Sequence, residues 1–138
     1  MGSEMCIRDR MEIRFLIEPS IAAMAAIRAD ETDIKNILTA CENTEKLLLA
    51  NKNHAEKDIA FHTAIALSSK NIVVPKLVPI INSSIPLIRE SAKFTMRDET
   101  IEIHREIADA IAAHDAVRAH DAMYLHLIYN RKHIKSIN

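Results

Sequence analysis

Apolar residues recur along the chain at intervals of three and four, the spacing of one face of an α-helix. Between residues 12 and 28 this face holds Ile13, Leu16, Ile17, Ile21 and Met24. The same spacing returns in five later segments, and none of them shows a convincing strand pattern. The pattern therefore predicts helices over residues 12–28, 30–50, 53–71, 72–94, 98–113 and 115–130.

Capping residues and prolines refine this picture. Asp30, which is followed by Asp33, and later Asp115 are residue types that cap helix N-termini. Pro79 and Pro86 fall inside the fourth segment, where each lacks a backbone N–H, so a kink or a break is expected there. Six helices joined by short connections predict an all-α antiparallel bundle.

The composition agrees with one helical domain. The 138 residues are 49% hydrophobic and 27% charged, and they include a single glycine, which argues against many tight turns. Residues 1–10 do not match the pattern that follows, and their Met-Gly-Ser start is typical of a cloning remnant. We therefore interpret residues 1–10 as a non-native or disordered leader, or a frayed helical extension, and residues 11–138 as the domain.

Charge and cysteine content narrow the function classes. The formal net charge is −1 and no basic cluster dominates a face, so this chain alone does not resemble a nucleic-acid binder. No apolar run of 18 residues is present, which predicts no membrane span, and no signal peptide is visible. Cys6 and Cys41 form no C-x-x-C motif, which indicates a reducing, cytoplasmic location.

The candidate chemistry centres on Asp58 and His62, which lie four residues apart and so share one face of the third helix. Phe61 lies beside them, and a buried carboxylate and imidazole are costly unless something neutralises them. His104 and His126 lie on the inner faces of the last two helices. If the four side chains converge, they suit a divalent metal, with Zn²⁺ the leading choice and Ni²⁺, Mn²⁺, Fe²⁺ or Co²⁺ as alternatives.

Other interpretations of these residues remain open. Each histidine could instead be a hydrogen-bonded core residue. An enzyme of the HD phosphohydrolase type is suggested by His114-Asp115 and His120-Asp121, although both dipeptides fall at a helix junction. A di-iron bundle would require Glu-x-x-His pairs, which the sequence lacks.

Four motifs resemble one known family. The run RFLIEPSIAAMAA at residues 14–26 resembles the opening helix of the FCD domain, the effector-sensing domain of many GntR-type bacterial transcription regulators. Later motifs resemble its other helices: D-x-x-F-H-x-x-I-A-x-x-S-x-N at 58–71, H-x-x-I-x-x-A-I-x-x-x-D-x-x-x-A at 104–119 and A-M-x-x-H-L at 122–127. The resemblance covers residues 12–135 in the right order.

The resemblance implies a metal-dependent sensor of a small carboxylate, without catalytic activity, that forms a homodimer. The family's upstream winged-helix domain is missing from these 138 residues, so contact with DNA is expected only through such a domain. The residues that the resemblance assigns are Asp58, His62, His104 and His126 to the metal, and Arg14, Asn71 and Arg89 to the effector.

Two of the effector candidates have alternative interpretations. Arg14 lies four residues before Glu18, so the two could form a surface ion pair on the first helix. Asn71 ends the third helix and could cap its C-terminus. If Arg14 does bind the effector, it can contact a carboxylate through two parallel N–H groups. That geometry and the open metal positions favour a small di- or tricarboxylate or hydroxy acid over a long acyl chain.

Overall fold

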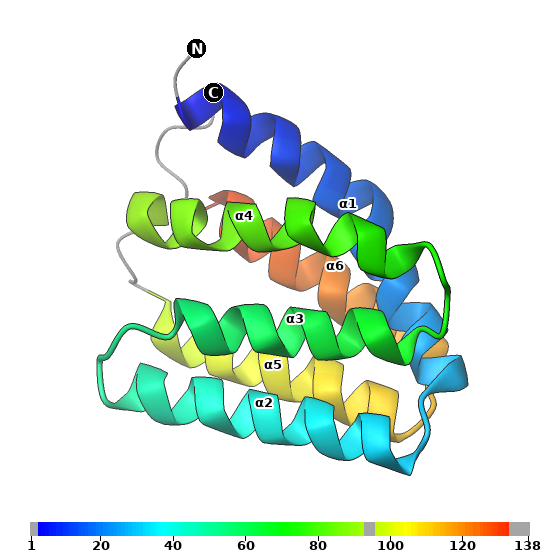
Figure 1. The fold of residues 1–138 in the computed structure, drawn as a ribbon. Coiled ribbons are helices and arrows are strands. Elements are labelled where there is room, and N and C mark those ends of the chain that lie inside the picture. Colours follow the sequence, from blue (N-terminus) through cyan, green and yellow to red (C-terminus); the bar gives the residue numbers. More distant parts are fainter. Residues whose placement is uncertain (1–2, 93–95, 133–138) are drawn as a thin grey trace.

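The computed structural model describes residues 3–92 and 96–132, with side chains from residue 7 to 86 and from 96 to 132. Within these ranges the chain forms helices and no strand, which confirms the all-α prediction. Successive helices run in opposite directions, and α2, α3 and α4 lie in front of α1, α5 and α6 (Figure 1). The helices are α1 (Ser3–Arg28), α2 (Glu31–Leu49), α3 (Ala55–Ser68), α4 (Val74–Ala92), α5 (Arg97–Ala112) and α6 (Ala116–Lys132).

Helix α1 is the central element, because it contacts α3, α4, α5 and α6. Its buried face carries Ala22, Ala25 and Ala26, whose small side chains let neighbouring helices approach closely. Larger side chains from the other helices complete the core. The most fully buried of these are Ile37, Phe61, Ile65, Ile107, Ile111 and Met123.

The first helix extends further toward the N-terminus than its apolar pattern predicts. It begins at Ser3, so the described part of residues 1–10 is helical, as in the frayed-helix alternative. Ile7 and Met11 are buried and form a small cluster with Leu127 of α6. This cluster attaches the start of α1 to the end of the bundle.

Two of the predicted helix caps are present. At the start of α2, the Asp33 backbone N–H donates to Asp30 Oδ1 at 2.8 Å, and the Asp30 N–H donates to Asp33 Oδ2 at 3.0 Å. At the start of α6, the Arg118 backbone N–H donates to Asp115 Oδ1 at 3.1 Å. Each cap satisfies backbone donors that the first turn of a helix leaves without partners.

Of the kink or break predicted for the fourth helix, the break is wrong. Helix α4 is continuous over Val74–Ala92 although Pro79 and Pro86 lie inside it. Each proline removes one backbone hydrogen bond, whereas Ile81 and Ile85 are buried in the core and hold the helix against α1 and α3. Tertiary packing therefore outweighs the local preference of the prolines.

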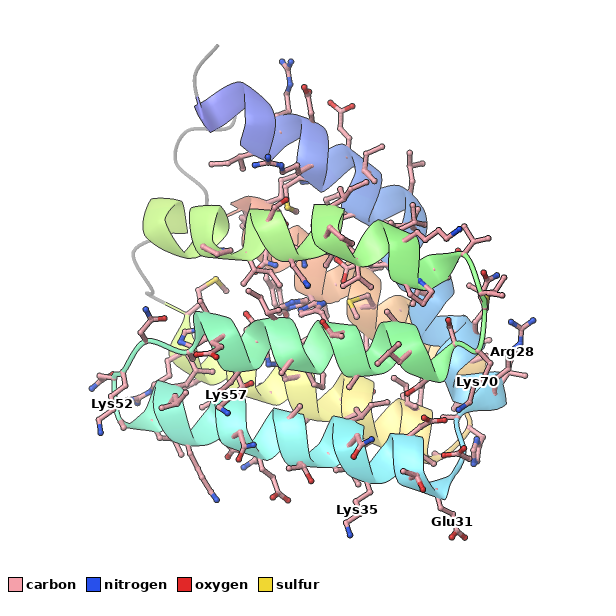
Figure 2. The ribbon with its side chains drawn as sticks, in the orientation of Figure 1. Arg28, Glu31, Lys35, Lys52, Lys57 and Lys70 are labelled. Atoms are coloured by element: carbon pink, nitrogen blue, oxygen red, sulfur yellow. The ribbon has the colours of Figure 1, made fainter. Side chains whose placement is uncertain are left out.

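The outer surface carries charged side chains together with scattered exposed apolar ones, such as Leu16 and Ile72. Glu31, Lys35 and Lys52 extend outward from the front layer (Figure 2). Among the described residues, no helix combines the length and the apolar character that crossing a membrane requires.

Candidate metal centre

Three helices bring the four predicted metal ligands together. Helix α3 supplies Asp58 and His62 from adjacent turns, and α5 and α6 supply His104 and His126. Asp58 Oδ1 lies 3.4 Å from His62 Nε2 and 3.7 Å from His104 Nε2. One ring nitrogen of each histidine lies within 4.8 Å of the other two. The sequence therefore identified a set of side chains that meet in space.

The imidazole rings form a compact group inside the bundle. His62 stacks on His126 with ring centroids 5.4 Å apart, and His104 meets His126 edge to face at 4.9 Å. The Phe61 ring covers His104 at a centroid distance of 4.7 Å. All of these side chains are buried, so their polar atoms face one another in a water-poor environment.

Four polar atoms at this point have no hydrogen-bond partner among the described residues: Asp58 Oδ1 and the Nε2 atoms of His62, His104 and His126. A buried polar atom without a partner costs about 1–3 kcal/mol, so four together indicate that a common partner belongs there.

The distances suit a single divalent cation. Ligand atoms about 2.1 Å from one ion lie about 3.0 Å apart at right angles and about 4.2 Å apart when opposite. The separations of 3.4 and 3.7 Å from Asp58 Oδ1 fall inside this range. Three neutral imidazoles and one carboxylate are a common donor set for Zn²⁺ and related ions. The residues present therefore fit a metal ion.

The charges around the centre favour a cation. Burial alone would raise the pKa of the Asp58 carboxyl, but the neighbouring imidazoles hold it well below its usual range. Burial lowers the pKa of His104 to about 4, and it also lowers that of His126 well below the usual value. Both rings are therefore neutral at pH 7, the form in which imidazole binds a metal.

Glu18 of α1 joins the centre, although the sequence analysis assigned it no functional role. Its Oε1 atom accepts a hydrogen bond from His62 Nδ1 at 2.6 Å, and its Oε2 atom accepts one from Arg14 Nε at 2.5 Å. Burial would raise the pKa of Glu18, but Arg14 and His62 lower it to about 2. Burial would likewise lower the pKa of His62, but Glu18 and Asp58 raise it to about 9. The i,i+4 spacing revealed the Arg14 contact, whereas the contact with His62 spans 44 residues.

Arg14 is fully buried beside this carboxylate, so the predicted surface location of the Arg14–Glu18 pair is wrong. Its Nη1 atom contacts Ser84 Oγ of α4 at 3.3 Å and Met11 Sδ at 4.0 Å. Its Nη2 atom has no hydrogen-bond partner among the described residues. A buried guanidinium with an unsatisfied N–H₂ group is suited to binding an anion.

The other two effector candidates have different outcomes. Asn71 follows the C-cap of α3, Ser69, so the predicted cap on the third helix is wrong. Asn71 Oδ1 instead accepts hydrogen bonds from the backbone N–H groups of Val73 and Val74, at 2.9 and 3.3 Å, and so caps the start of α4. The side chain of Arg89, within α4, lies outside the described residues.

The dipeptides that suggested a phosphohydrolase do not form a second centre. His114 Nδ1 bonds to the Ala26 carbonyl at 2.8 Å, which ties the α5–α6 turn to α1. His120 and Asp121 pair with each other at 3.0 Å on the exposed side of α6. The histidine of the first pair thus has a structural bond, and the second pair is open to solvent, so neither supports the alternative.

Comparison with known proteins adds an independent line of evidence. The FCD domain family model matches residues 9–128. The HTH-type transcriptional regulator YcbG of Bacillus subtilis (strain 168) is 29% identical over 124 residues, covering 90% of this chain and 52% of that protein. The galactonate operon transcriptional repressor of Escherichia coli (strain K12) is 33% identical over 113 residues, covering 75% of this chain and 47% of that protein.

A solved structure agrees with these sequence relatives. Streptococcus agalactiae GntR superposes with a TM-score of 0.84 at 33% identity, covering 95% of this chain and 61% of that one. The chain spans about half the length of the curated relatives described above. These relatives are transcriptional regulators and not enzymes. The chain belongs to the FCD domain family, and its relatives are regulators of the GntR type, as its motifs predicted.

Proposed function

We propose that this chain is the effector-sensing domain of a transcription regulator, and that it binds a divalent metal and a small carboxylate. The observation that carries the proposal is a cluster of buried ligand atoms that have no hydrogen-bond partner among the described residues. The ring nitrogens of His62, His104 and His126 lie within 4.8 Å of one another, and Asp58 Oδ1 lies beside two of these rings. A bound ion would satisfy all four atoms at once. Its remaining coordination positions would be available to oxygen atoms of an effector.

The metal that this donor set favours first is Zn²⁺, followed by Ni²⁺, Mn²⁺ and Fe²⁺. When bound, the ion would supply a Lewis-acid centre that holds carboxylate or hydroxyl oxygens. The protein supplies two neutral imidazoles, from His104 and His126, and an ionised Asp58. It also supplies Glu18, which hydrogen-bonds to the far side of the His62 ring.

The effector class follows from Arg14 together with the metal. Arg14 is buried and its Nη2 atom lacks a partner, so it can neutralise a carboxylate group that the metal does not hold. Polar side chains fill the centre of the bundle, which disfavours a long acyl chain. The name of one relative, the galactonate operon repressor, includes a small hydroxy acid and is consistent with this class.

The whole regulator would contain more than this domain. The chain covers 52% of a relative described as HTH-type, so we infer that contact with DNA is made through a separate N-terminal domain. Homodimerisation is part of the same proposal, because α1 exposes Leu16 at 72% and Ile27 at 67% of their surface. Sedimentation that shows only monomer at micromolar concentration would contradict the dimer.

The test combines elemental analysis with a thermal-shift screen. Purified protein should carry about one divalent ion per chain, since the three histidine nitrogens lie within 4.8 Å of one another and so could share one ion. Citrate, malate and galactonate should raise the melting temperature of metal-loaded protein and have much less effect on metal-stripped protein. Equal stabilisation of both forms, or stabilisation by fatty acids alone, would refute carboxylate sensing through the metal.

A further inference from the structure

The Glu18 carboxylate contacts both halves of the proposed site. One oxygen accepts a hydrogen bond from the metal-ligand candidate His62, and the other accepts one from the effector candidate Arg14. Glu18 is 3% exposed, and its helix, α1, contributes none of the four proposed metal ligands. The carboxylate therefore links α1 to a centre that is otherwise built from α3, α5 and α6.

The geometry defines what this carboxylate does to each partner. The bond from Nδ1 to Glu18 fixes the His62 ring with Nε2 facing Asp58 Oδ1, 3.4 Å away. When a metal ion displaces the Nε2 proton, the Nδ1–H stays bonded to Glu18 and the Nε2 lone pair is available to the ion. The bond from Arg14 Nε uses one edge of the guanidinium, and no described residue is a hydrogen-bond partner of the Nη2 atom. The two donors meet different oxygen atoms of Glu18, and a glutamine amide would offer an oxygen to one donor and an N–H₂ group to the other.

We propose that Glu18 is a positioning residue, which orients His62 for the metal and Arg14 for the effector. This inference rests on the proposed function, since it specifies how that site is held. Glu18 itself would touch neither the metal nor the effector. It would couple the two binding events to the placement of α1, the helix that contacts four other helices of the bundle.

The decisive variant is Glu18→Gln, which keeps the size of the side chain. Its amide N–H₂ group would face one of the two donors and could not accept a hydrogen bond from it. Zn²⁺ affinity, measured by competition with a chelator, should fall about 10- to 100-fold, the usual effect of removing a group that orients a metal ligand. The absorption spectrum of the Co²⁺-substituted protein should change, because the His62 ring is no longer held in place. Glu12→Gln is the matched control, since Glu12 lies on the exposed side of α1 with a side chain 69% accessible.

A wild-type measurement keeps the test valid if Glu18→Gln fails to fold. Long-range ¹H–¹⁵N NMR of the Zn²⁺-loaded protein should show His62 protonated at Nδ1 and bound through Nε2. Binding through Nδ1 would overturn the inference. So would a folded Glu18→Gln variant with wild-type Zn²⁺ affinity and Co²⁺ spectrum but a lower melting temperature, because Glu18 would then be only an ion-pair partner. Failure of the wild-type protein to bind Zn²⁺ would instead refute the proposed function and this inference with it.

Discussion

Replacing His104 with alanine should abolish most of the stabilisation that the metal provides. His104 Nε2 lies 3.7 Å from Asp58 Oδ1 and has no hydrogen-bond partner among the described residues. The substitution also removes the ring that packs on Phe61. That packing loss is present with and without the metal, so it cancels when the metal-induced shifts of the two proteins are compared.

The expected magnitude follows from ligand linkage. A free metal concentration about 100 times the dissociation constant stabilises the wild-type protein by about 2.7 kcal/mol. An unfolding entropy of about 2.1 cal/mol/K per residue, over 138 residues, converts this into a rise in melting temperature of about 9 °C. Loss of one ligand should weaken binding by about 100-fold or more, since removing a supporting residue alone costs about 10- to 100-fold. The metal-induced shift in His104→Ala should then be about 1 °C.

Differential scanning fluorimetry of metal-stripped and Zn²⁺-loaded protein measures this shift directly. His120→Ala is the matched control, because His120 is a half-exposed histidine of α6 that pairs with Asp121 on the next position of the chain. The control should keep the full wild-type shift. An equal metal-induced shift in His104→Ala and wild type would refute the assignment of His104 to the site.

Three further changes probe other parts of the molecule. Arg14→Lys should retain the metal but weaken the thermal response to citrate, because lysine cannot bind a carboxylate through two parallel N–H groups; an unchanged citrate response would exclude Arg14 from the effector site. Cys41 is buried, and this burial, together with the nearby Glu45, raises the pKa of its thiol to about 11. Peptide mass spectrometry should therefore show no alkylation of Cys41 at pH 8 in folded protein and full alkylation in denaturant. Asp30→Ala should lower the free energy of unfolding by about 1 kcal/mol through loss of the α2 cap, and a chemical denaturation curve matching wild type would contradict that role.

Much of the fold was accessible from periodicity, because each helix buries one face against the others. The number of helices and the caps at Asp30 and Asp115 followed from residue type and spacing. The continuity of α4 could not be predicted in this way. The local preference of Pro79 and Pro86 predicts a kink or a break, whereas packing against α1 and α3 holds the helix together. The helical start of α1 was left open, because few apolar residues precede Met11.

In the candidate site, too, some contacts could be predicted from the sequence and others could not. Asp58 and His62 were recognisable as neighbours from their spacing on one helix, and their meeting with His104 and His126 rested on inner-face positions and on the family resemblance. The contact of Glu18 with His62 could not be predicted, because it joins residues 44 positions apart on different helices. Spacing also cannot report burial, so the Arg14–Glu18 pair was expected at the surface rather than in the core.

The proposal that this chain holds a metal in its core is tested most directly by anomalous diffraction from crystals grown with Zn²⁺. Data collected on both sides of the zinc absorption edge should give one strong peak per chain, about 2.1 Å from Asp58 Oδ1 and from the Nε2 atoms of His62, His104 and His126. A map without a peak at this position, or with a peak only at a surface group such as His120 and Asp121, would contradict the assignment of the metal centre.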